Sequence, residues 1–171
     1  MKVEKTKLDG VLKIRLDAFK DFRGYYIETY NEDLYKKNGI HIKFVQDDIS
    51  VSHNNVLRGI HGDKNTWKLI SCLEGEFYLV VINNDNKSDQ FKQWESFLLS
   101  EENRIQILVP PKFGNGHYVL SERAIFHYKQ NTYYDPSGQF TILWNDSNYQ
   151  IDWPCKNPII SKRDELGYFV D

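Results

Sequence analysis

The chain has 171 residues, a length that suits one domain with a sizeable hydrophobic core. Lysine and arginine number 22 against 24 aspartate and glutamate, so the formal net charge is -2 and the pI is ≈ 6.2, which excludes the basic field of a general nucleic-acid-binding surface. Aromatic residues make up 15 % of the chain, as is typical of the pleated, half-buried surfaces of β-strands.

Neither a leader segment nor a membrane span is predicted. The N-terminus is polar, and the longest apolar run, residues 77–82, is far too short to cross a bilayer. Cys72 and Cys155 are the only cysteines, and two cysteines without a secretory signal predict free thiols in a reducing compartment. We therefore expect a cytoplasmic protein with no membrane partner, in which Cys72 is a small buried hydrophobe.

Short runs of β type, separated by turn signals, follow one another along the chain. Residues 11–16 alternate with period two, and residues 24–30 follow a polar turn. Further strands are predicted at 44–46, 49–52, 56–61, 76–82, 93–99, 105–109, 117–120, 124–134 and 140–144, with a polar loop at 83–90 and a strand-ending Pro110–Pro111. No linker or repeat intervenes, so we predict one domain over 1–171, a β-sandwich or barrel.

One helix is predicted from about residue 32 to residue 38. Asn31 can cap its first amides, and Glu32 and Asp33 lie at the positive end of the helix dipole. Gly39 supplies the left-handed residue that ends it.

Several sequence blocks occur in a fixed order along nearly the whole chain. They include FRGYYIE at 22–28, FVQDDIS at 44–50, VLRGIH at 56–61, VPPKFG at 109–114, WND at 144–146 and ISKRD at 160–164. The ordered series resembles the dTDP-4-dehydrorhamnose 3,5-epimerase family. The resemblance implies an all-β, cupin-type jelly-roll barrel with one or two short helices. It also implies a homodimer in which an N-terminal segment crosses to the partner, and cofactor-free inversion of carbons beside the ketone of an NDP-4-keto-6-deoxy sugar.

Inversion beside a ketone needs a base near neutral pKa, a positive group or donor at the enolate oxygen, and a group that returns a proton to the opposite face. By resemblance, His61 is the base and Asp164 the carboxylate that orients its imidazole. Lys68 is the cation near the ketone oxygen, and Tyr128 is the proton donor. Tyr128 shares a strand face with Phe126, so it should point into the apolar barrel. Without the resemblance, the sequence favours ordinary roles for His61 and Asp164 as a strand-end histidine and a surface aspartate, and core packing is a strong alternative for Tyr128. Lys68 is then explained equally well as a solvated lysine.

The resemblance also implies a set of substrate-binding positions. Arginine suits a diphosphate because its fork makes paired, charge-assisted hydrogen bonds. The set consists of Arg23, Glu28, Gln46, Asp48, Arg58, Asn115 and Arg163. Surface salt bridges are the alternative role for the arginines, and Tyr133 and Trp144 either line the pocket or fill the core.

Arg58 and His61 pose a geometric problem. They are three residues apart, so a regular strand would place them on opposite faces, whereas both are needed in one cleft. We therefore predict a bulge or kink at Gly59, because glycine often marks such irregularities.

The chain departs from the family pattern on the sugar side. The family commonly reads Ala-His-Gly after the proline loop, but here Asn115 replaces the histidine, and an amide cannot carry its charge. Asp48 replaces an asparagine, and Ser137 falls near an expected acidic residue. These changes put the rhamnose-pathway substrate in doubt. The altered pocket resembles that of family members that act on GDP-linked 4-keto-6-deoxyheptoses for capsule synthesis, so this resemblance favours such a substrate, inverted at C3 and possibly C5. The alternative is dTDP-4-dehydrorhamnose.

Three further functions stay open. A metal-binding cupin could use His61 and His117 with Glu74 or Glu76, although position 63 is Asp63 and so no His-x-His pair flanks the base. A non-catalytic sugar-nucleotide sensor could use the same barrel, but would not need a base. A 3,4-ketoisomerase would share the enolate chemistry and move the carbonyl. We expect no metal and no cofactor.

Overall fold

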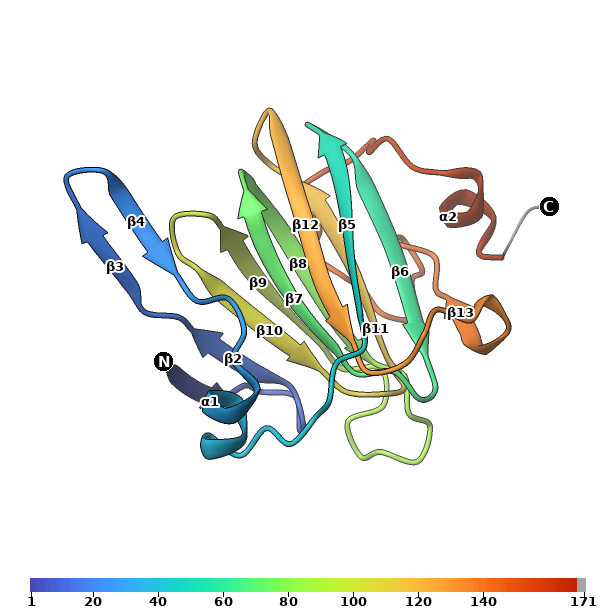
Figure 1. Ribbon diagram of the computed structural model, residues 1–171. Coiled ribbons are helices and arrows are strands. Elements are labelled where there is room, and N and C mark those ends of the chain that lie inside the picture. Colours follow the sequence, from blue (N-terminus) through green and yellow to red (C-terminus); the bar gives the residue numbers. More distant parts are fainter. Residues whose placement is uncertain (169–171) are drawn as a thin grey trace.

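Residues 1–168, which the computed structural model describes, form two antiparallel sheets that face each other (Figure 1). Within this span the first sheet has six strands, in the order β1 (Lys2–Lys5), β2 (Leu12–Arg15), β10 (Ile105–Val109), β7 (Lys68–Glu74), β12 (Arg123–Gln130) and β5 (Gln46–His53). The second, in the same span, has five, in the order β13 (Gln139–Thr141), β6 (Leu57–Asp63), β11 (Phe113–Val119), β8 (Glu76–Asn83) and β9 (Trp94–Ser100). The predicted all-β jelly-roll class is confirmed.

A separate hairpin and short helices complete the fold. Strands β3 (Ala18–Asp21) and β4 (Gly24–Ile27) pair with each other and project from the body of the molecule (Figure 1). Helix α1 (Glu32–Lys37) confirms the predicted helix: Leu34 N donates to Asn31 Oδ1 at 3.1 Å, and Gly39 has a φ of 83°. A 3₁₀ turn, η1 (Pro136–Gly138), and helix α2 (Lys162–Leu166) lie near the C-terminus.

The predicted strands coincide with observed strands, with several corrections of extent. The predicted pair 44–46 and 49–52 is one strand, β5, and the predicted strand 117–120 begins earlier, at Phe113. The predicted strands 24–30, 124–134 and 140–144 are too long, because β4 ends at Ile27, β12 at Gln130 and β13 at Thr141. Strands β1, β3 and β7 and helix α2 were not predicted. In β7, Leu69 packs on one face of the sheet and Ile70 on the other, so the alternation that marks a half-exposed strand is lost.

The core consists of three clusters, one between the sheets and one against part of the outer face of each sheet. Side chains such as Ile70, Phe77 and Phe126 fill the space between the sheets. Helix α1 contributes Tyr35 to a cluster outside the first sheet, and Trp153 belongs to a cluster outside the second. Cys72 is only 7 % exposed, which confirms the prediction of a buried thiol, and it is a free cysteine, as is Cys155.

The predicted bulge at Gly59 is present. On β11, Asn115 and His117 are two residues apart, but their partners on β6, His61 and Arg58, are three apart, so β6 carries an extra residue. Gly59 has a φ of 119°, a conformation that side chains rarely adopt, and the Gly59–Ile60 peptide bond is cis. The irregularity restores Arg58 and His61 to one side of the strand.

The C-terminal segment returns alongside β6. Leu57 N donates to Ile159 O at 2.9 Å, and Ile159 N donates to Asn55 O at 2.8 Å. Ser161 then caps helix α2, where its Oγ accepts a hydrogen bond from Asp164 N at 3.2 Å. This path delivers Asp164 to the strand that carries His61.

Replacing Gly59 by alanine should destabilise the fold. A Cβ there would lie 2.6 Å from Gly116 Cα and 2.8 Å from Asn115 O, which are backbone atoms that cannot yield. We expect Gly59→Ala to lower the free energy of unfolding by more than the roughly 1–3 kcal/mol of backbone strain alone, as measured by urea denaturation. Gly24→Ala is the matched control, since Gly24 has a φ of 128° but no atom within 4 Å of the added Cβ. Equal losses in the two variants would contradict the steric argument.

Candidate active site

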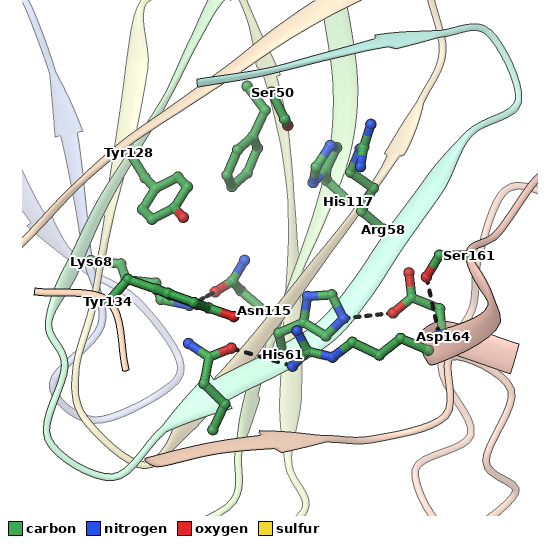
Figure 2. Close-up of a pocket in the computed structure, with 13 residues that line it drawn as sticks. Ser50, Arg58, His61, Lys68, Asn115, His117, Tyr128, Tyr134, Ser161 and Asp164 are labelled. Carbon is green, nitrogen blue, oxygen red and sulfur yellow. Dashed lines mark hydrogen bonds and ion pairs between the residues drawn. The ribbon is translucent and has the colours of Figure 1, made fainter. Parts of the chain in front are cut away.

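A pocket between the two sheets gathers most of the predicted site residues (Figure 2). Strands β6 and β11 supply one wall and β5, β7 and β12 supply the facing wall, with helix α2 and strand β13 at the side. The lining includes all four residues predicted to be catalytic, His61, Lys68, Tyr128 and Asp164. It also includes three predicted binding residues, Arg58, Asn115 and Arg163.

His61 and Asp164 form a hydrogen-bonded pair. His61 Nε2 lies 2.5 Å from Asp164 Oδ1, and the aspartate side chain is only 3 % exposed. Gly59 N donates to the second carboxylate oxygen at 3.3 Å. With the carboxylate ionised and the imidazole neutral, Nε2 carries the proton and Nδ1 keeps its lone pair. The pair therefore holds the imidazole in the form of a base.

Burial sets the charge state of this pair. It lowers the pKa of His61, although the neighbouring Asp164 carboxylate opposes the shift by favouring the imidazolium. Burial alone would raise the pKa of Asp164, but its hydrogen bonds with His61, Gly59 and Ser161 outweigh that and hold the pKa below its ordinary value. The free site thus contains a neutral histidine beside an ionised aspartate at neutral pH.

Lys68 lies at the start of β7 and points into the pocket. Its Nζ donates to Asn115 Oδ1 at 3.4 Å and lies 5.7 Å from the centre of the Tyr128 ring. Burial lowers the pKa of Lys68 to about 8, while the Asp63 carboxylate acts in the opposite direction. A poorly hydrated cation of this kind interacts strongly with a developing negative charge.

Tyr128 lines the pocket beside Phe126, so the prediction that it points into the barrel is confirmed. Burial and the nearby Asp48 carboxylate raise the pKa of Tyr128 to about 12, which keeps the phenol protonated. Gln46 and Asp48 do not line the pocket. Gln46 donates to Asp48 at 2.8 Å and accepts from Tyr134 N at 2.9 Å, so the two predicted binding residues support the tyrosines that form the pocket wall.

Two arginines bring positive charge to the pocket. Arg58 Nε donates to Ser52 Oγ at 2.9 Å. Arg163 Nε donates to Thr141 Oγ1 at 3.0 Å, and its Nη2 donates to Gln139 Oε1 at 3.2 Å. Strand β13 therefore holds the Arg163 guanidinium against the rim, next to the aspartate of the pair.

Arg23 and Glu28 do not line this pocket of a single chain, so their predicted role in substrate binding stays a prediction. Arg23 is in the turn of the β3–β4 hairpin, pairs with Asp21 at 2.5 Å and has a side chain that is 76 % exposed. Glu28 follows β4 and is exposed. Tyr133 is also exposed, and Trp144 packs in the cluster outside the second sheet.

Some lining residues were missed by the sequence analysis. Ser50, His117, Tyr134 and Gln139 all face the pocket. Strand periodicity gave a usable signal for two of them, because Ser50 is two residues after Asp48 and His117 is two after Asn115. Tyr134 and Gln139 follow β12 in an irregular stretch, where periodicity gives no signal.

The site shows no cluster of metal ligands. Among residues 1–168 no group of three or more His, Cys, Asp or Glu side chains is placed to hold a metal ion. In the same part of the chain no helix has both the length and the apolar character needed to cross a membrane.

Comparisons with known proteins agree on one family. The family model described as dTDP-4-dehydrorhamnose 3,5-epimerase matches residues 5–170. The enzyme of that name from Salmonella typhimurium is 39 % identical over 100 % of this chain and 96 % of its own length. A Legionella pneumophila dTDP-6-deoxy-D-glucose-3,5-epimerase, solved in complex with dTDP-4-keto-L-rhamnose, is 35 % identical with a TM-score of 0.93, covering 98 % of this chain and 91 % of that one. The Bacillus anthracis dTDP-4-dehydrorhamnose 3,5-epimerase, with TDP and PPi bound, is 34 % identical with a TM-score of 0.94 and 99 % coverage of both chains.

Replacing Asp164 by asparagine should lower the pKa of His61 further. The amide keeps the shape of the carboxylate but removes the negative charge that favours the imidazolium, so the histidine titrates at lower pH. NMR titration of the histidine ring resonances measures the shift. His127, which lies outside the pocket beside Asp47, is the internal control and should not move. A His61 pKa that stays constant or rises in Asp164→Asn would contradict the assigned coupling.

Proposed function

The chain belongs to the dTDP-4-dehydrorhamnose 3,5-epimerase family and is an isomerase that acts on a nucleotide-linked sugar, and we propose that it inverts C3 and C5 of a dTDP-linked 4-keto-6-deoxyhexose. The observation that carries the proposal is the neutral His61, paired with buried Asp164, in a pocket that also presents Lys68 and Tyr128.

A dTDP-linked hexose replaces the GDP-linked heptose that the sequence departures favoured. The relatives act on, or were solved with, dTDP-linked compounds, so they support the alternative better. Two of the residues that differ from the family pattern, Asn115 and Asp48, also interact with side chains of this chain. Asn115 accepts a hydrogen bond from Lys68, and Asp48 lies beside Tyr128, so both residues act on neighbouring side chains and require no larger sugar.

The proposed reaction begins at His61. Its Nδ1 lone pair takes the proton from the carbon beside the ketone, and the ionised Asp164 stabilises the imidazolium that forms. The electron pair moves onto the ketone oxygen, where the Lys68 ammonium stabilises the enolate. Asn115 keeps that ammonium in place.

Reprotonation comes from the other side of the pocket. His61 is on β6 of the second sheet and Tyr128 is on β12 of the first, and Figure 2 shows them on opposite sides of the pocket. A sugar ring between them would present one face to the base and the other to the phenol. Because Tyr128 stays protonated, it can donate to the carbon from which His61 took a proton, and the result is inversion.

The alternatives fit the site less well. A non-catalytic sensor would have no use for a buried histidine–aspartate pair, since an ionised carboxylate is expensive to desolvate. A 3,4-ketoisomerase would need proton transfer on one face to relocate the carbonyl, whereas here the base and the donor are on opposite walls. Product NMR separates these outcomes.

We further propose that the active form is a homodimer. The β3–β4 hairpin exposes 69 % of Phe19, 97 % of Phe22 and 67 % of Tyr26, a patch of the kind that marks a protein interface. The pocket of one chain encloses only ≈ 230 Å³, less than the roughly 300–1,000 Å³ of sites that bury a whole drug-sized ligand. The nucleotide would then extend from the mouth, within reach of Arg23 and Glu28 of a second copy.

Incubation with dTDP-4-keto-6-deoxyglucose in deuterated water tests the reaction. We expect NMR to find deuterium at both C3 and C5, and His61→Asn to slow the exchange at least about a hundredfold while dTDP still binds. His53→Asn, which changes an exposed histidine outside the pocket, is the control and should exchange normally. Label at C3 alone would contradict double inversion, and no label would contradict epimerisation.

Mixing two impaired variants tests the dimer. Arg23→Ala should weaken nucleotide binding and activity, and His61→Asn should abolish catalysis. If Arg23 serves the partner's pocket, a dimer of one Arg23→Ala and one His61→Asn subunit has one complete site, so equimolar co-expression should restore about a quarter of wild-type activity under random pairing. No recovery, or a monomer in sedimentation analysis, would contradict the proposal.

A further inference from the structure

His117 is a buried polar residue to which the reaction described above gives no role. It lies on β11, lines the pocket and is only 3 % exposed. Its ring stacks on Phe126 at 4.2 Å between centroids and 8° between planes, and it also contacts Phe77 at 5.2 Å. Within residues 1–168, its Nε2 is shielded from solvent and has no hydrogen-bond partner.

This placement is unfavourable for the folded chain alone. A buried polar atom without a partner loses its hydration and gains nothing in return. Phenylalanine would fill the space between Phe77 and Phe126 without that penalty. Most buried polar groups are satisfied, so an unsatisfied one beside a ligand pocket calls for a functional explanation.

The imidazole is neutral and its orientation is fixed. Burial lowers the pKa of His117 to about 3, and the Arg58 guanidinium acts in the same direction. A buried lone pair without a donor is tolerated more readily than a buried N–H without an acceptor. The shielded Nε2 is therefore the unprotonated nitrogen. The proton is then on Nδ1, the ring nitrogen left to face the pocket as a donor.

The position of His117 relative to the base defines what it can reach. Asn115 pairs with His61 across the β6–β11 ladder, and His117 is two residues further along the same face of β11. That separation is about 7 Å along the strand, comparable with the span of a sugar ring and its substituents. A sugar with its reacting carbon at His61 would therefore extend a hydroxyl group toward His117.

We propose that His117 contacts the substrate, with its Nδ1–H donating a hydrogen bond to a hydroxyl oxygen of the bound sugar, and thereby helps determine which sugars the pocket accepts. The inference rests on the proposed function. A hydroxyl group suits a neutral donor, whereas the diphosphate suits the charged guanidinium groups of Arg58 and Arg163. Stacking on Phe126 keeps the donor in place before the sugar arrives.

Two substitutions at position 117 separate hydrogen bonding from packing. His117→Phe keeps the aromatic ring and removes the donor, and His117→Asn keeps an N–H close to the place of Nδ1 and removes the stack. We expect His117→Phe to be at least as stable as the wild type to thermal unfolding, but to lose about three- to tenfold in kcat/KM, the range for one neutral hydrogen bond. We expect His117→Asn to be less stable and yet to retain more activity than His117→Phe.

A hydrogen-bonding role and a packing role of His117 thus predict opposite orders of activity for His117→Phe and His117→Asn. If the residue only packs, activity follows stability, so His117→Phe is the better enzyme, and that result overturns the proposal. Calorimetric titration adds a test without turnover: His117→Phe should lose affinity for dTDP-glucose but keep its affinity for dTDP. Equal affinities of wild type and His117→Phe for dTDP-glucose would also overturn it. A wild type that neither binds nor converts dTDP-sugars would instead refute the proposed function itself.

Discussion

The hydrogen bond between His61 and Asp164 joins residues that are 103 positions apart, and the pocket depends on it. An ionised carboxylate that is only 3 % exposed is tolerable because two groups hydrogen-bond it: the imidazole of His61 and Gly59 N. The C-terminal segment reaches this position by bonding alongside β6. The pair and the hydrogen bonds from Arg163 to strand β13 together hold helix α2 beside the second sheet.

The same contact requires an irregular strand. His61 must face the pocket to meet Asp164, and Arg58 must face it to bring a guanidinium, but a regular strand separates residues three apart. The extra residue at Gly59 removes the conflict, and the Gly59 amide freed from the ladder is the one that hydrogen-bonds Asp164. One glycine therefore corrects the direction of two side chains and provides a donor for a buried charge.

How much of the fold and of the site could be predicted depended on how far along the chain each kind of sequence pattern carries information. Local periodicity gave most strands, and the spacing of Arg58 and His61 gave the bulge. Periodicity did not predict β7, because both faces of that strand are buried. Ordered sequence blocks pointed to His61, Lys68, Tyr128 and Asp164, which the fold then brought together. The sequence blocks that contain Arg23 and Glu28 do not tell whether these residues belong to the pocket of their own chain or to that of a second copy. His117 could have been assigned to the pocket because it lies two residues after Asn115, but the lack of a hydrogen-bond partner for its Nε2 is a property of packing that the sequence does not carry.

Desolvation is the main cause of the pKa shifts of His61, Lys68, His117 and Tyr128, whereas hydrogen bonds outweigh it at Asp164. Burial favours the neutral form of any ionisable group, so it lowers the pKa of His61 and His117 and raises that of Tyr128. The barrel thereby holds a histidine ready to accept a proton and a tyrosine ready to donate one at the same pH. Lys68, with a pKa of about 8, keeps its charge near neutrality because it starts from a much higher ordinary value. Under the proposed mechanism, position relative to the two faces of the sugar then decides which neutral group takes the proton and which returns it.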